Sequence, residues 1–79
     1  MLPMQKGSNE YFVLSVGFNR TGYPLITIYE QGNSCCYKLP YEYGDWVQTM
    51  VEFAECGINL FPTKVKFSLI DGKSYVDFM

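Results

Sequence analysis

The sequence has 79 residues, a net charge of −2 and a pI of about 4.8, with 48% of its residues apolar. This apolar content excludes a disordered chain, because it suffices to offset the entropy of ordering one small domain. The charge argues against nucleic-acid binding, which depends on clustered cations, whereas the cationic residues here are scattered: Lys6, Arg20, Lys38, Lys64, Lys66 and Lys73.

The three cysteines, Cys35, Cys36 and Cys56, do not form an even, spaced disulfide framework. Residues 1–8 contain no apolar signal core, and no apolar run approaches the length that crosses a membrane. We therefore expect a reduced, soluble, cytoplasmic protein without membrane association.

In chain order, residues 1–9 are polar and irregular, which predicts a loose arm. From Glu10 the pattern alternates with a period of two, as in a strand. One face of this strand carries Phe12, Leu14, Val16 and Phe18, and the other carries Tyr11, Val13, Ser15 and Gly17. Turn residues at 19–22 and 31–34 bound two further strands, at 25–30 and 35–39.

The register of these strands is tested by asking which pairing keeps apolar residues together. A five-residue first loop pairs Val16 with Ile26 and Leu14 with Ile28, although a slip by one residue stays open. A two-residue turn at 32–33 pairs Ile28 with Tyr37 and Ile26 with Leu39. The predicted core face is then Phe12, Leu14, Val16, Phe18, Ile26, Ile28, Cys35, Tyr37 and Leu39.

A helix is predicted over residues 45–56. Asp45 is placed to cap it with Gln48 three residues later, and Gly57 is placed to end it in the left-handed conformation. At 100° per residue the apolar side chains form one face, which predicts one-sided packing on a sheet. These side chains are Trp46, Val47, Met50, Val51, Phe53 and Ala54.

Two last strands, at 64–70 and 73–78, flank the hairpin dipeptide Asp71-Gly72. A two-residue turn there pairs Val65 with Phe78, and it also places Lys66 opposite Asp77. The predicted fold class is α+β, a single domain over residues 1–79. Its antiparallel sheet follows the order β-β-β-α-β-β, with the helix across one face.

The residues of an ordinary catalytic site are missing. The sequence has no histidine, no glycine-rich phosphate loop and no cysteine spacing typical of zinc sites. Cys36 lacks a histidine to activate it, and the Glu52–Glu55 pair lies on an exposed helix face that would not shift its pKa values. We therefore expect no enzyme, no cofactor and no metal.

The tyrosines offer one binding hypothesis. Tyr11, Tyr29 and Tyr75 are predicted to point outward from the sheet, where bases of a single strand could stack. Tyrosines are also ordinary strand residues, and the charge favours this simpler interpretation. Single-strand nucleic-acid binding is kept as an alternative.

The outer face of the sheet offers a second hypothesis. Val13, Leu25, Tyr29 and Cys36 are predicted to lie together there, and a contiguous exposed apolar patch is typical of an interface. The alternative is that the arm, or the connector at 57–63 with its apolar residues, folds back over this patch.

The helix and its entry carry only negative charge, at Glu42, Asp45, Glu52 and Glu55, which would suit a basic partner. The leading hypothesis is therefore a non-enzymatic module that binds, and inhibits, a larger host or cellular protein. In size and acidity the chain is similar to the small inhibitors of phages and mobile elements, including anti-CRISPR proteins, without a shared motif. A self-associating domain is a further alternative.

Overall fold

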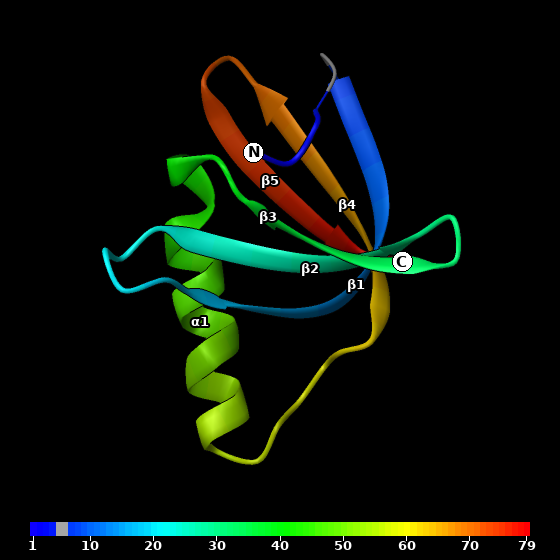
Figure 1. The fold of residues 1–79 in the computed structure, drawn as a ribbon. Helices are drawn as coiled ribbons and strands as arrows, with labels where there is room; N and C mark the ends of the chain where they lie inside the picture. Colours follow the sequence, from blue (N-terminus) through cyan, green and yellow to red (C-terminus); the bar gives the residue numbers. More distant parts are fainter. Residues whose placement is uncertain (5–6) are drawn as a thin grey trace.

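The computed structural model describes residues 1–4 and 7–79 as one antiparallel sheet with one α-helix (Figure 1). The sheet order is β3-β2-β1-β4-β5, and the helix packs against β1 and β2, which confirms the expected α+β architecture. The elements are β1 (Gly7–Phe18), β2 (Pro24–Glu30), β3 (Asn33–Lys38), the 3₁₀ turn η1 (Tyr41–Tyr43), α1 (Gly44–Glu55), β4 (Thr63–Ile70) and β5 (Lys73–Phe78).

The β4–β5 hairpin has the register predicted for it. Val65 pairs with Phe78, and Lys66 lies opposite Asp77. Asp71 and Gly72 both have positive φ, at 51° and 76°, as a two-residue turn that follows the twist of the strands requires.

The β1–β2 hairpin matches the prediction over only half its length. Five residues form the loop, and Val16 pairs with Ile26 as expected. Beyond that point a β-bulge intervenes: β1 takes three steps from Val16 to Val13 while β2 takes two from Ile26 to Ile28. The expected pairing of Leu14 with Ile28 is therefore wrong, because Leu14 is the extra residue of the bulge.

The bulge exchanges the two faces of β1. Val13 is 0% exposed and lies in the core, whereas Phe12 is 43% exposed and lies on the outer face opposite Tyr29. The predicted core position of Phe12 and the predicted outward position of Val13 are both wrong. The reason is that one added residue shifts a period-two pattern to the opposite face.

The β2–β3 hairpin turns one residue earlier than predicted. Gln31 and Gly32 form the turn, with φ of 50° and 83°, so that Ile28 pairs with Cys35 and Ile26 with Tyr37. This register differs from the expected one by two residues. A shift of two keeps every side chain on its face, so the composition of the core is unaffected.

The helix begins earlier than predicted and without a side-chain cap. Tyr43 is the N-cap and makes no capping hydrogen bond through its side chain, because the preceding turn η1 leads directly into α1. Asp45 lies in the first turn, where its carbonyl accepts a hydrogen bond from Thr49 Oγ1 at 3.0 Å. The prediction that Asp45 caps the helix is wrong, although its charge still suits a helix N-terminus.

The helix ends at the glycine predicted to end it. Gly57 has φ of 85°, its N–H donates to the Ala54 carbonyl, and the Ile58 N–H donates to the Phe53 carbonyl. These two bonds are the Schellman pattern, which needs a left-handed residue and favours glycine.

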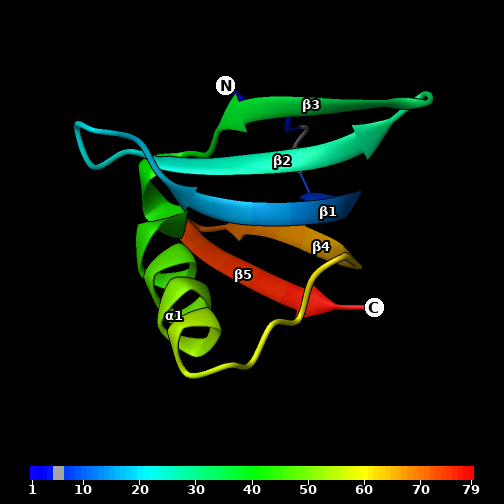
Figure 2. The ribbon, with the colours of Figure 1, turned by 60° about the horizontal axis from the view of Figure 1, so that its bottom comes forward.

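The core lies between the inner face of the sheet and the η1–α1 segment, which crosses one end of the strands (Figure 2). Phe67 contacts two rings edge-on, those of Tyr43 and Trp46, each with its centroid 5.4 Å away. The buried residues that pack together in this core are Leu2, Val13, Ile26, Ile28, Leu39, Tyr43, Val47, Val65 and Phe67.

The amino-terminal segment contributes to this core. Leu2 is buried, and its N–H donates to the Lys38 carbonyl at the end of β3, at 2.8 Å. The arm expected over residues 1–9 is thus fastened at Leu2, and its last residues belong to β1. Gln5 and Lys6 lie outside the described residues.

Candidate functional site

Four exposed carboxylates, which we call the acidic face, follow one side of η1 and α1. They are Glu42, Asp45, Glu52 and Glu55, the helical residues predicted for partner binding. Over residues 1–4 and 7–79, the one ion pair joins Lys64 Nζ to Glu10 Oε1 at 3.3 Å, away from this face. The acidic face therefore has no cationic neighbour within ion-pair distance in that part of the chain.

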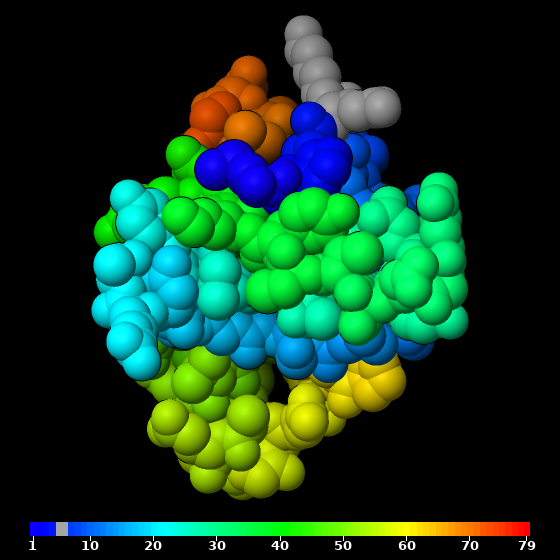
Figure 3. Space-filling model, viewed as in Figure 1, coloured from blue at the N-terminus to red at the C-terminus, as the bar shows by residue number. Residues whose placement is uncertain are grey.

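Beside the acidic face lies an apolar cleft of about 410 Å³, which we call the helix-side cleft. It opens because α1 projects past the sheet before the connector turns back to β4, and Figure 3 shows the hollow between the helix and the connector. Its lining residues come from three segments: Leu14, Ser15 and Val16; Met50, Val51, Ala54 and Glu55; and Asn59 and Phe61.

Three residues that neighbour the lining residues in the sequence are exposed and apolar. Phe53 is 40% exposed and Ile58 is 52% exposed, and Leu60 is similarly exposed on the connector. Glu55 belongs both to the lining of the cleft and to the acidic face. The cleft and the acidic face therefore meet at Glu55 and form one surface, which we call the helix-side surface.

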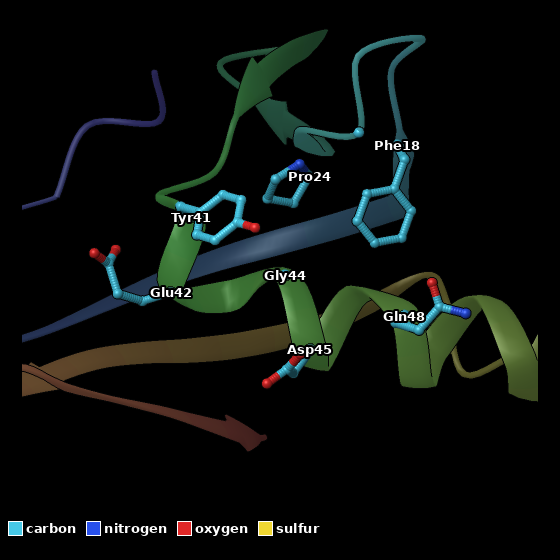
Figure 4. Close-up of a pocket in the computed structure, with 8 residues that line it drawn as sticks. Phe18, Pro24, Tyr41, Glu42, Gly44, Asp45 and Gln48 are labelled. Carbon is cyan, nitrogen blue, oxygen red and sulfur yellow. The ribbon is translucent and has the colours of Figure 1, made fainter.

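A second cleft, of about 390 Å³, lies between the β1–β2 loop and the start of α1 (Figure 4). The rings of Tyr41 and Phe18 flank it, with Pro24 between them. The carboxylates of Glu42 and Asp45 point away from these rings. This cleft extends the acidic face towards the loop, but its carboxylates are directed outside it.

The outer face of the sheet differs from the patch predicted there. Val13 is not part of it, because the bulge turns this residue into the core. Leu25 is half-buried, whereas Tyr29 and Cys36 are exposed. The polar Thr27 lies between Leu25 and Tyr29 along β2 and pairs with Cys36, whereas the exposed Phe12 pairs with Tyr29 on this face.

Residues 1–4 and the connector pack on the inner side of the sheet and not over its outer face. The connector residue Phe61 packs its ring against those of Trp46 and Phe78, at centroid distances of 6.2 and 6.3 Å. Leu2 is likewise in the core. Both segments that could have folded over the outer face are therefore anchored on the inner side.

Of the three tyrosines predicted to point outward, two do. Tyr29 and Tyr75 are exposed, but Tyr11 is half-buried against Phe67, with its hydroxyl donating to the Pro3 carbonyl. Burial, and secondarily the charge of Glu30, raises the pKa of Tyr11. Tyr11 is turned inward by the same bulge that turns Val13, since the two are separated by one strand period.

The lysines of the sheet lie beside carboxylates. Lys64 pairs with Glu10, and Lys66 lies opposite Glu10 on β1 and opposite Asp77 on β5. Lys38 lies over the ring of Tyr23, with Nζ 5.0 Å from the ring centroid. Lys64 and Lys38 therefore have partners within the chain, and Lys66 has carboxylates opposite it in register, which lowers the positive potential available to phosphates.

The cysteines do not form a disulfide: Cys35 is half-buried, and Cys36 and Cys56 are exposed thiols. Within the described residues, no group of three or more metal-ligating side chains comes together. The same part of the chain holds no helix that combines the length and the apolar character needed to cross a bilayer.

The helix-side cleft contains residues that sequence reasoning did not select. Leu14 was assigned to the core face of its strand, and Ala54 to the core face of the helix. The length of the apolar helix face could have indicated this cleft. The face continues to the last turn of the helix, where the sheet no longer covers it.

The chain has no match among models of known protein families, among curated proteins or among solved structures.

Proposed function

We propose that this domain is a non-enzymatic protein-binding module that engages a larger partner through the helix-side surface. The observation that carries the proposal is the helix-side cleft, an apolar hollow of about 410 Å³ directly beside carboxylates that have no cationic neighbour within ion-pair distance among residues 1–4 and 7–79. Specific protein interfaces combine an apolar, well-desolvated centre with a polar rim.

The chemistry of the surface defines the partner. An aliphatic or aromatic side chain of the partner would enter the cleft, where Leu14, Met50 and Val51 offer apolar contacts. Lys or Arg residues beside that anchor would meet Glu55 and Glu52. Opposite charges at a rim accelerate association and orient the partner. Within this proposal, a small acidic chain that occupies such a site on a larger assembly would act as its inhibitor.

The test is capture of partners from the source cell by immobilised protein, followed by affinity measurement with the captured protein. Glu55→Lys is compared with Glu30→Lys, because both residues are exposed and both changes add the same charge, but Glu30 lies at the far end of β2. We expect Glu55→Lys to weaken binding about tenfold, equivalent to about 1.4 kcal/mol, and Glu30→Lys to change it little.

Reversing Glu52 and Glu55 together should weaken the interaction further and reduce its dependence on salt. Equal affinity of the Glu55→Lys and Glu30→Lys proteins would remove the helix-side surface from the proposal.

A further inference from the structure

We infer that the free edge of β3 pairs with β3 of a second copy of this chain, antiparallel and about a twofold axis. β3 and β5 are the two edges of the sheet. An edge strand carries backbone N–H and C=O groups that can bond another strand. This inference is independent of the helix-side surface and concerns how the domain associates with itself.

Two hydrogen bonds establish which backbone groups of β3 point to the free edge. The Lys38 carbonyl accepts from Leu2 N at 2.8 Å, so it points away from β2, whereas the next N–H, of Leu39, donates to Pro24 of β2 at 2.9 Å. Backbone directions alternate along a strand, so Ser34 and Cys36 share the outward direction of Lys38.

The outward groups of Ser34 and Cys36 are open. Of the described residues, Leu2 alone bonds this edge, and it reaches only the end of the strand, at Lys38. The N–H and C=O groups of Ser34 and Cys36 can therefore form hydrogen bonds with a strand of another molecule.

The two edges of the sheet differ in protection. The β5 edge carries the charged residues Lys73 and Asp77, and the segment before the helix contacts it, with Ser74 Oγ donating to the Glu42 carbonyl at 3.0 Å. Between Ser34 and Tyr37, β3 has no charge, no proline and no bulge. Charges, prolines and bulges are the features that keep edge strands from pairing, and β3 lacks them there.

The open groups are self-complementary in one register. With Cys35 of each copy on the twofold axis, Ser34 of each copy lies opposite Cys36 of the other. Each such pair exchanges two hydrogen bonds, so the outward N–H and C=O groups of Ser34 and Cys36 are all bonded in both copies. Centring the axis on Cys36 instead would pair Ser34 with Lys38, whose carbonyl is already bonded to Leu2.

The pairing is compatible with the rest of the molecule. Figure 2 shows β3 at one end of the stack of strands and the connector after α1 at the other. Two sheets joined at β3 would therefore leave both helix-side surfaces accessible, so that the dimer is bivalent. The contact is short, and its small buried area predicts a dimer that dissociates on dilution.

The first experiment measures molecular mass under reducing conditions over a wide concentration range. We expect the mass to rise from 9.1 kDa towards twice that value with increasing concentration. Cys36→Pro removes one outward N–H, a change that edge strands tolerate, and should abolish the rise. Cys36→Ser keeps the N–H and should retain it. A mass of 9.1 kDa at every concentration would overturn the inference.

The second experiment does not depend on the proline variant being folded. In the proposed register the two Cys35 residues form a non-hydrogen-bonded pair, the closer of the two kinds of cross-strand pair, with Cβ atoms about 4.5 Å apart, at the upper end of the separation that a disulfide spans. A protein with Cys35 as its single cysteine should cross-link on mild oxidation with diamide at least tenfold faster than one with Cys36 as its single cysteine. Equal rates, or faster cross-linking through Cys36, would contradict the register.

Discussion

At the scale of single residues, the side chain of Tyr43 connects the start of the helical segment to the sheet through one hydrogen bond. Its ring is buried against Phe67, and its hydroxyl donates to the Ser68 carbonyl at 2.9 Å. A buried hydrogen bond of this kind contributes about 0.5 to 1.5 kcal/mol to stability in net terms. This one contact therefore links η1, which carries Glu42, to β4.

We expect Tyr43→Phe to lower the free energy of unfolding by about 0.5 to 1.5 kcal/mol, because the buried hydrogen bond from its hydroxyl to the Ser68 carbonyl would be lost. The measurement is urea denaturation at neutral pH. Tyr41→Phe is the matched control, since the Tyr41 side chain is largely exposed and should tolerate the change. Equal denaturation midpoints for the two variants would contradict this role of the hydroxyl.

The same hydroxyl makes stability depend on alkaline pH. Burial, and secondarily the charge of Glu42, raises the pKa of Tyr43 above its ordinary value of 10.0. Above that value the unfolded state loses its proton first, so the free energy of unfolding falls as pH rises, until the folded group ionises as well. Tyr43→Phe should therefore lose less stability than the wild type over this range.

At the scale of the element, the bulge in β1 decides which residues face the core. Without it, strict alternation would bury Phe12 and Leu14; with it, Val13 is buried instead. The bulge also leaves Leu14 and Ser15 at the mouth of the helix-side cleft. Bulges commonly redirect side chains next to functional sites, and this one separates the core from the cleft.

Val13→Ser should lower the free energy of unfolding by about 2 kcal/mol or more, because it removes apolar contacts and buries a hydroxyl without a partner. Phe12→Ser should cost much less, although it removes a larger side chain, since Phe12 is already 43% exposed. Chemical denaturation of the two variants measures the difference. The opposite order of stabilities would mean that β1 is unbulged.

The two halves of the helix have different surroundings. Its first half packs on the sheet through Val47 and Met50, whereas its last turns expose Phe53 and Ala54. An apolar stripe that continues past the sheet produces the helix-side cleft. The amphipathic pattern alone cannot divide the stripe into a packed part and a free part, because both parts have the same periodicity.

At the scale of the whole molecule, the amino-terminal segment completes a core that the sheet and helix leave open. Leu2 is 2% exposed although it is the second residue of the chain. A domain of 79 residues has a small core, so that one further buried leucine is a substantial part of its stability.

We expect Leu2→Ala to lower the free energy of unfolding by about 2 kcal/mol, the lower limit for a buried leucine, because a terminal segment can readjust. For a domain of this size the melting temperature would fall by roughly 10 °C. Pro3→Ala, at an exposed position that keeps its carbonyl for Tyr11, is the control. An unchanged melting temperature for Leu2→Ala would show that the segment does not contribute to the core.

The sequence by itself determined the features that depend on neighbours along the chain. The Asp71-Gly72 turn, the left-handed Gly57 and the alternation of β4 and β5 follow from local backbone preferences, and these predictions are confirmed. The order of the elements and the α+β class could also be predicted, because apolar residues repeat every two residues in a strand and every 3.6 residues in a helix.

Tertiary structure alone decided which apolar residues are buried. The bulge at Leu14, the burial of Leu2 and the open last turns of α1 each depend on contacts between distant segments. The energy of burial depends on what covers a side chain, which a one-dimensional pattern does not specify. For this reason the acidic face could be read from the sequence, whereas the apolar cleft beside it could not.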